Sequence, residues 1–147
     1  MRLVIQRTTG CELFIAGQRH SGIGDGLVIL FGTKLGDNEL SCRWLAEKAA
    51  NLRIFEDDDG KLNRSVLDIG GEVMVVSQFT LYADCRKGRR PSFNAAMEPS
   101  EAEQLYDRFV EEMKATGLPV STGLFGARMD VKFTNHGPVT IIVDHDV

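Results

Sequence analysis

The segment Ser77-Gln78-Phe79-Thr80-Leu81 combines hydroxyl and amide groups with one aromatic ring. It lies where the apolar run at residues 73–76 gives way to a polar, basic stretch. The end of a strand can present such side chains, together with free backbone N–H groups, to a ligand. From these residues alone two interpretations stay open: a ligand site at the end of a strand, or a strand that simply ends.

A second polar segment, Asn135-His136-Gly137-Pro138-Val139-Thr140, lies between two apolar runs near the C-terminus. A hairpin connection between two strands is its simplest interpretation. A Gly-Pro bond also adopts the cis form more readily than other peptide bonds do. A cis bond here would direct two successive carbonyl groups the same way, an arrangement that suits an ammonium group.

A third segment, residues 86–90, contains four cations: Arg86, Lys87, Arg89 and Arg90. The whole chain has 17 basic and 21 acidic residues and a net charge of −4, so only a local basic patch could bind nucleic acid. A solvated run of charge and a clamp for the phosphates of an RNA backbone are both compatible with this segment.

Other chemistries find little support. The three histidines lie far apart without an HExxH motif, and the three cysteines are widely spaced without a CxxC motif, so we expect no metal and no cofactor. A Gly-x-Ser-x-Gly elbow for a Ser-His-Asp triad is missing. The glycine-rich residues 22–26 precede a predicted strand rather than a helix, which favours a tight turn over a nucleotide loop.

Strands dominate the predicted elements. β-Branched, aliphatic and aromatic residues predict them at residues 3–5, 12–15, 27–31, 72–79, 129–134 and 139–143. The first two are expected to be separated by a turn at Thr8-Thr9-Gly10.

Two helices are predicted between the strands. The first begins with Asp37 as its N-cap and ends near residue 52. Its apolar stripe comprises Leu40, Trp44, Leu45, Ala49 and Leu52. The second begins with a capping box of Ser100 and Glu103 and ends before Gly117 and Pro119. Its apolar face comprises Ala102, Leu105, Tyr106, Phe109, Val110 and Met113.

The sequence contains no internal repeat and no linker. Its apolar runs are shorter than the ~20 residues that a membrane span needs. We therefore expect a single domain at residues 1–147. Its predicted fold is α+β and dominated by strands, with a mixed, partly barrel-like sheet and two main helices.

Taken in order, these segments resemble the D-aminoacyl-tRNA deacylase (D-tyrosyl-tRNA(Tyr) deacylase) family. Residues 77–81 and 135–140 look like its paired signature, and Thr8-Thr9-Gly10-Cys11 departs from the form expected there. The likeness extends over nearly the full chain through Val4-Ile5-Gln6-Arg7, Asn51-Leu52-Arg53-Ile54-Phe55, Gly88-Arg89-Arg90-Pro91-Ser92-Phe93, and Thr122-Gly123-Leu124-Phe125-Gly126-Ala127 with Met129.

The resemblance implies a cytoplasmic, homodimeric editing enzyme. Such an enzyme hydrolyses the ester between a D-amino acid, or mischarged glycine, and the 3′-terminal adenosine of tRNA. Its partners are tRNA and a second copy of itself, with neither DNA nor a membrane.

The resemblance also implies roles for single residues. Gly137 and Pro138 would enter the partner's active site in a Gly-cisPro loop, hold the α-amino group with backbone oxygens and leave no space for an L side chain. Asn135 belongs to that loop segment, Arg7 would brace the loop and Met129 would line the pocket.

The catalytic segment is expected to comprise Ser77, Gln78, Phe79 and Thr80. We expect backbone N–H groups near Phe79 and Thr80 to stabilise the oxyanion. The ribose 2′-OH of the tRNA would then orient the attacking water. A Thr80 nucleophile is the alternative, although neither motif offers it an acidic or histidine base. A non-catalytic RNA-binding module and a hydrolase of small esters remain rival functions.

Overall fold

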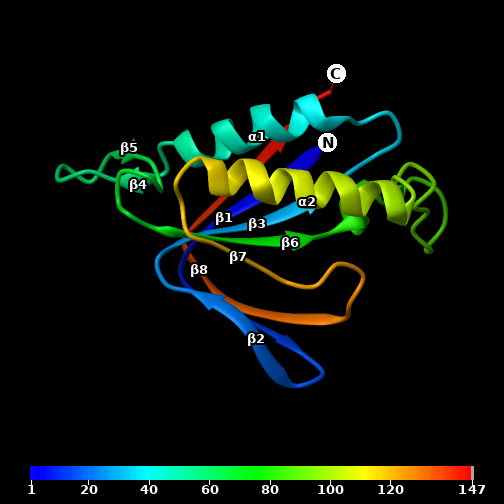
Figure 1. The fold of residues 1–147 in the computed structure, drawn as a ribbon, viewed down its shortest axis with the longest axis horizontal. Helices are drawn as coiled ribbons and strands as arrows, with labels where there is room; N and C mark the ends of the chain where they lie inside the picture. The colour runs from blue at the N-terminus through cyan, green and yellow to red at the C-terminus, as the bar shows by residue number, and fades with distance from the viewer. Residues whose placement is uncertain (147) are drawn as a thin grey trace.

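Six strands form one strongly bent mixed sheet, and two helices cover one of its faces (Figure 1). The computed structural model describes residues 1–146. The six strands are β1 (Arg2–Ile15), β2 (Gln18–Ile23), β3 (Gly26–Gly32), β6 (Glu72–Ser77), β7 (Val120–Thr122) and β8 (Met129–Asp144). The short strands β4 (Phe55–Glu56) and β5 (Leu62–Arg64) form a separate hairpin.

The sheet is mixed and nearly closed, as predicted. Its strand order is β2-β1-β3-β6-β7, with β8 paired to β1, and the β3–β6 and β6–β7 pairs are parallel. The two ends of this order meet. Ser21 Oγ donates to the Thr122 carbonyl at 2.7 Å, and Ser121 Oγ donates to the Gly22 carbonyl at 3.3 Å. These side chains join β2 to β7 where no backbone ladder does.

The continuous apolar run of β3 is explained by burial on both faces. Leu27, Ile29 and Phe31 pack in the core beneath the helices. Val28 points the other way, into a smaller core inside the bent sheet that includes Leu13. Because side chains alternate along a strand, a strand covered on both faces needs apolar residues at every position.

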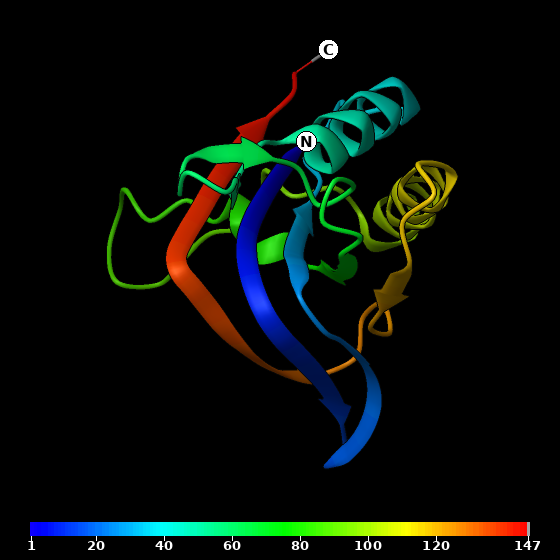
Figure 2. The ribbon, with the colours of Figure 1, turned by 90° about the vertical axis from the view of Figure 1, so that its left-hand side faces the viewer.

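The predicted turn at residues 8–10 is wrong, since β1 is one strand of 14 residues. Its pairing with β8 shifts register on both sides of Thr8. Thr8 Oγ1 donates to the Gly10 carbonyl at 2.8 Å and accepts from the Gly10 N–H at 3.1 Å. The polar residues therefore make an irregularity in a strand that bends without reversing, and β8 follows the same curve (Figure 2).

Residues 135–140 do not form a hairpin. Asn135 pairs with Thr8 and Thr140 pairs with Gln6, so the chain keeps its direction along β1. The residues between them form a wide bulge in β8, called its loop below, in which residues 136–138 are exposed. The Gly137–Pro138 peptide bond is cis.

The first helix, α1 (Glu39–Asn51), begins one residue later than predicted. Asn38 is its N-cap, because the Asn38 side chain accepts the Leu40 N–H at 3.0 Å. Asp37 instead accepts the Lys34 N–H at 2.8 Å and the N-terminal amine at 2.6 Å. The expected stripe is also wrong at Leu40 and Trp44, which are exposed, and the buried residues are Ser41, Cys42, Leu45, Ala46, Ala49 and Ala50.

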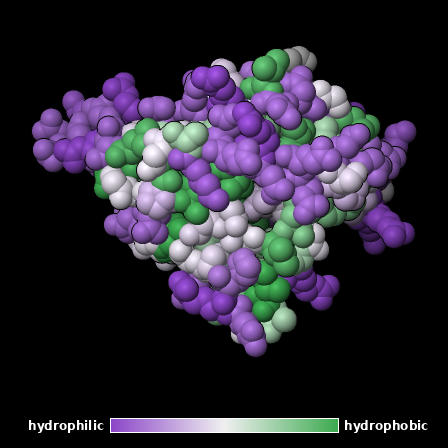
Figure 3. Space-filling model, viewed as in Figure 1, coloured by the Kyte–Doolittle hydropathy of each residue, from purple (hydrophilic) through white to green (hydrophobic). Residues whose placement is uncertain are grey.

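The second helix, α2 (Pro99–Ala115), has the predicted apolar face but not the predicted capping box. Pro99 opens it, Glu98 is the N-cap without a side-chain hydrogen bond, and Gly117 follows its end at φ +91°. The Tyr106 hydroxyl donates to the Val75 carbonyl at 2.9 Å and ties α2 to β6. Hydrophilic residues gather over the outer face of the helices (Figure 3). Within residues 1–146 we find no helix long and apolar enough to cross a membrane.

Candidate active site

A pocket of about 570 Å³ opens where β6 ends and α2 begins. It brings together four of the expected site residues, Ser77, Gln78, Phe79 and Met129. The lining comes from these stretches of the chain: Phe31 and Thr33; Val76 to Phe79; Phe93; Ala96 to Pro99 with Ala102; Phe125 to Ala127; and Met129 with Val131.

The polar edge of the pocket is made by the turn that follows β6. The Gln78 N–H donates to the Phe31 carbonyl at 2.7 Å, and the chain then forms a 3-10 helix, η1 (Phe79–Tyr82). The first N–H groups of such a helix have no partner within it. The Phe79 ring is 57% exposed and meets the Phe93 ring edge-on, with 5.1 Å between centroids. The pocket mouth thus has an aromatic wall beside a turn whose first N–H groups are not used within η1.

Thr80 lies in η1 but outside the pocket lining. Its exposed hydroxyl accepts a hydrogen bond from the Gln78 side-chain amide. An amide NH₂ donates a proton but does not take one, so this contact cannot activate the hydroxyl as a nucleophile. The geometry favours a supporting role for Thr80.

The other walls of the pocket are apolar. Met129 opens β8, and its Sδ would lie 2.3 Å from a Cβ added at Gly123, so the chain passes this side chain closely. Glu98 is the single charged side chain in the lining. Neither Glu98 nor the wall at the start of α2 was predicted, because apolar and helix-capping residues carry no chemical motif.

Arg7 is almost fully buried, at 4% exposure, and holds the loop of β8. Its Nε donates to the His136 carbonyl at 3.1 Å, and its Nη1 donates to the Ile54 carbonyl at 3.0 Å and lies 3.6 Å from Glu56 Oε1. Beside it, the Asn135 Nδ2 donates to Thr140 Oγ1 at 3.3 Å. The buried Asn135 Oδ1 has no partner within residues 1–146.

The Arg7-braced loop and the pocket are separate within this chain. Gly137 and Pro138 lie in the middle of β8, whereas the beginning of β8, at Met129 and Val131, reaches the pocket. Neither Gly137 nor Pro138 lines the pocket. The predicted site residues are therefore found at two places rather than one.

The basic segment forms a loop closed by two backbone hydrogen bonds between Asp84 and Ser92, of 2.7 and 2.9 Å. Arg86 pairs with Asp84 and holds the pKa of that carboxyl down at about 2. Lys87, Arg89 and Arg90 are exposed. Phe93, just beyond the loop, lines the pocket, so these cations lie close to its mouth along the chain.

A sequence model of the D-Tyr-tRNA(Tyr) deacylase family matches residues 4–144. The chain belongs to this family. Two relatives, both D-aminoacyl-tRNA deacylases, agree with it. That of Thermomicrobium roseum is 54% identical over 144 residues, covering 98% of this chain and 94% of the relative. That of Desulfotalea psychrophila is 50% identical over 146 residues, covering 99% and 98%.

Two solved structures share the fold. A protein described as a c-Myc DNA unwinding element binding protein superposes with a TM-score of 0.93 over 100% of both chains, at 38% identity. A probable eukaryotic D-amino acid tRNA deacylase superposes with a TM-score of 0.82 over 98% of both chains. At 18% identity, that second likeness concerns the fold alone.

Proposed function

We propose that this deacylase-family chain acts as one domain that hydrolyses the ester between a D-amino acid, or mischarged glycine, and the 3′-terminal adenosine of tRNA. The pocket at the end of β6 carries this proposal, since it gathers Ser77, Gln78 and Phe79 at the start of η1. It has room for a nucleoside and a small acyl group. A cytoplasmic location follows from this substrate.

Chiral selection is proposed to come from the loop at Gly137 and Pro138 of a second copy. The loop is exposed and fixed by Arg7, yet lies away from its own chain's pocket. A rigid backbone segment lent by a partner would leave space for hydrogen or a D side chain on Cα but none for an L side chain. Such exclusion selects without fitting any particular side chain, so many D-amino acids would be accepted.

For the chemical step we propose oxyanion stabilisation by the N–H groups of Phe79 and Thr80. Loss of one such donor commonly costs about 3–4 kcal/mol. The ribose 2′-OH would orient the water that attacks the ester carbonyl. Thr80→Ala is therefore expected to keep near-normal turnover, and tRNA ending in 2′-deoxyadenosine to lose it. If Thr80→Ala loses turnover as completely as wild type does with the 2′-deoxy tRNA, Thr80 acts as the nucleophile.

The exposed cations Lys87, Arg89 and Arg90, with Arg86, are proposed to contact the tRNA backbone near the pocket mouth. Binding should then weaken as salt rises, because phosphate contacts release counterions. Neutralising all four should flatten that salt dependence. If the salt dependence of binding is unchanged in that variant, the loop is a solvated surface that does not contact tRNA.

One assay separates the proposal from its rivals. D-aminoacyl-, glycyl- and L-aminoacyl-tRNA are each incubated with the protein, and released amino acid is counted. We expect release from the first two only. Binding of aminoacyl-tRNA without release of amino acid would indicate a non-catalytic RNA-binding module. Cleavage of free D-aminoacyl esters as fast as of D-aminoacyl-tRNA would indicate a hydrolase of small esters.

A further inference from the structure

η1 makes part of the pocket mouth but has no buried residue of its own. Its internal bonds, such as Leu81 N–H to the Gln78 carbonyl at 3.2 Å, shape the turn without attaching it to the sheet. Burial of apolar side chains normally fixes an element in place. The Gln78 N–H bond to the Phe31 carbonyl and the half-buried Leu81 and Tyr82 hold η1 only in part, so its other contacts with the strands beneath it matter.

A row of three residues on neighbouring strands lies under η1. Arg2 of β1 pairs with Gly32 of β3 on one side and with Asp144 of β8 on the other. A Cβ added at Gly32 would lie 3.0 Å from the Gln78 carbonyl oxygen and 3.1 Å from Leu81 Cβ. The missing side chain at Gly32 thus lets η1 rest directly on β3.

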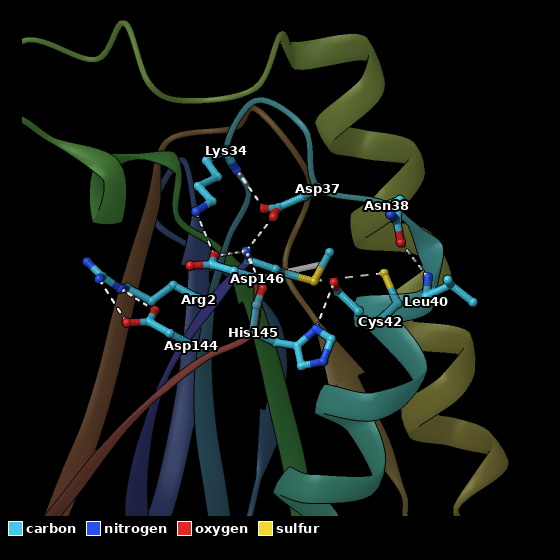
Figure 4. Close-up of polar contacts among 11 residues, drawn as sticks. Arg2, Lys34, Asp37, Asn38, Leu40, Cys42, Asp144, His145 and Asp146 are labelled. Carbon is cyan, nitrogen blue, oxygen red and sulfur yellow. Dashed lines mark hydrogen bonds and ion pairs between the residues drawn. The ribbon is translucent and has the colours of Figure 1, made fainter.

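The Arg2 guanidinium connects this row to η1. Its Nε and Nη2 donate to the two carboxylate oxygens of Asp144, at 2.7 and 3.0 Å (Figure 4). Its Nη1 donates to the Leu81 carbonyl at 3.2 Å, and the group lies 5.4 Å from the Tyr82 ring centroid. Two of its nitrogens are thus held by β8, and the third holds η1.

Both members of the pair are stabilised in their charged forms. The hydrogen bonds to Asp144 raise the pKa of Arg2, and those from Arg2 lower the pKa of Asp144. The fork of a guanidinium is rigid and planar, so fixing two nitrogens on a carboxylate also fixes the direction of the third.

We infer that Arg2, held by Asp144, is a positioning residue that sets the place of η1, and with it the Phe79 ring and the N–H groups of Phe79 and Thr80. Its effect on η1 is independent of the reaction. Its effect on turnover rests on the proposed function.

The direct test is hydrogen exchange of the peptide that covers η1, in wild type, Arg2→Met and Lys34→Met. Lys34 is a matched control, since it pairs with Asp146 at 2.6 Å at the same end of the sheet, and among the described residues it makes no hydrogen bond or ion pair with η1. We expect faster exchange of η1 in Arg2→Met only. Equal protection of η1 in all three proteins would overturn the inference, whether or not the chain is active.

Two further variants cover the case in which Arg2→Met does not fold. Arg2→Lys keeps the charge beside Asp144 but lacks the fork, and Asp144→Asn weakens the hold on the fork. Each should loosen η1, less than Arg2→Met does. Wild-type protection in both would contradict the inference.

The kinetic test compares kcat with KM for D-aminoacyl-tRNA. Arg2→Met should lower kcat by up to about a hundredfold, as displaced catalytic groups do, with KM nearly unchanged. Arg2→Lys should restore part of that loss, and Lys34→Met should change neither constant. A loosened η1 with wild-type kcat would disconnect η1 from the chemistry, whereas an inactive wild type would refute the proposed function and leave the exchange result standing.

Discussion

Arg7 is a buried cation whose hydrogen bonds all go to backbone carbonyls, those of His136 and Ile54, with Glu56 close by. Arg7→Met would leave both carbonyls without their charged donor. Loss of such a donor costs about 1–3 kcal/mol in stability. If the loop excludes L side chains, loosening it should also raise L-aminoacyl-tRNA hydrolysis relative to D.

Denaturant unfolding and the ratio of L to D hydrolysis check this prediction. Arg43→Met is the control, because Arg43 pairs with Glu47 on the exposed face of α1. A destabilised Arg7→Met protein that still rejects L substrates would separate the loop from chiral selection.

Single residues also differ in their expected reactivity, as the three cysteines show. Burial raises the pKa of the Cys11 thiol to about 11 and that of Cys42 to about 12, whereas Cys85 is exposed. The thiolate is the reactive form, and both buried thiols stay protonated and covered near pH 8. A thiol reagent should label one cysteine in the native protein and three after unfolding. In native Cys85→Ser protein the reagent should label no cysteine. Rapid labelling of that variant would show that the core around Cys11 or Cys42 opens.

At the scale of elements, α2 is attached to the sheet by aromatic packing. Phe109 is fully buried and stacks on Phe31, with 4.8 Å between ring centroids, and Phe31 also lines the pocket. Phe109→Ala should cost about 3–5 kcal/mol, because the removed ring leaves a cavity. Thermal and denaturant unfolding measure this loss, with Phe109→Leu expected to lose less. A loss below 1 kcal/mol would mean that the core closes around the gap.

The two helices and the long apolar strands were readable from the sequence, whereas the more polar strands β2 and β7 were missed. The ends of the predicted elements depended on distant residues. Asp37 and Asn38 are both good N-caps, and Asn38 takes the role because the N-terminal amine holds Asp37. That contact joins residues 36 positions apart, which no local pattern reveals. Likewise, Thr8 could begin a turn, and its pairing with Gly26 of β3 and Asn135 of β8 keeps β1 continuous.

The candidate site divides in the same way. The residues with distinctive chemistry, Ser77 to Phe79 and Met129, were predicted through the family resemblance and do share a pocket. Its apolar walls, Glu98 and the Arg2 contact with η1 were missed. Such residues have ordinary types, and their roles arise only from tertiary placement.

For the whole molecule, the separation of loop and pocket makes a prediction about mixed subunits. Arg7→Met gives a chain with a faulty loop and a sound pocket. Ala127→Trp fills the pocket, which Ala127 lines, and leaves the loop sound. In a mixed dimer, the sound pocket would receive the sound loop, because each site would combine both chains.

Mixing the two variants should therefore lower L-aminoacyl-tRNA hydrolysis per Arg7→Met protomer while D hydrolysis persists. The rates are measured after subunit exchange, which sedimentation of differently labelled chains verifies. Mixing Arg7→Met with itself at the same total concentration is the control. A loop supplied by the partner must restore the rejection of L substrates in mixed dimers. If subunits exchange and L-aminoacyl-tRNA hydrolysis stays unchanged, each chain therefore selects chirality with its own residues.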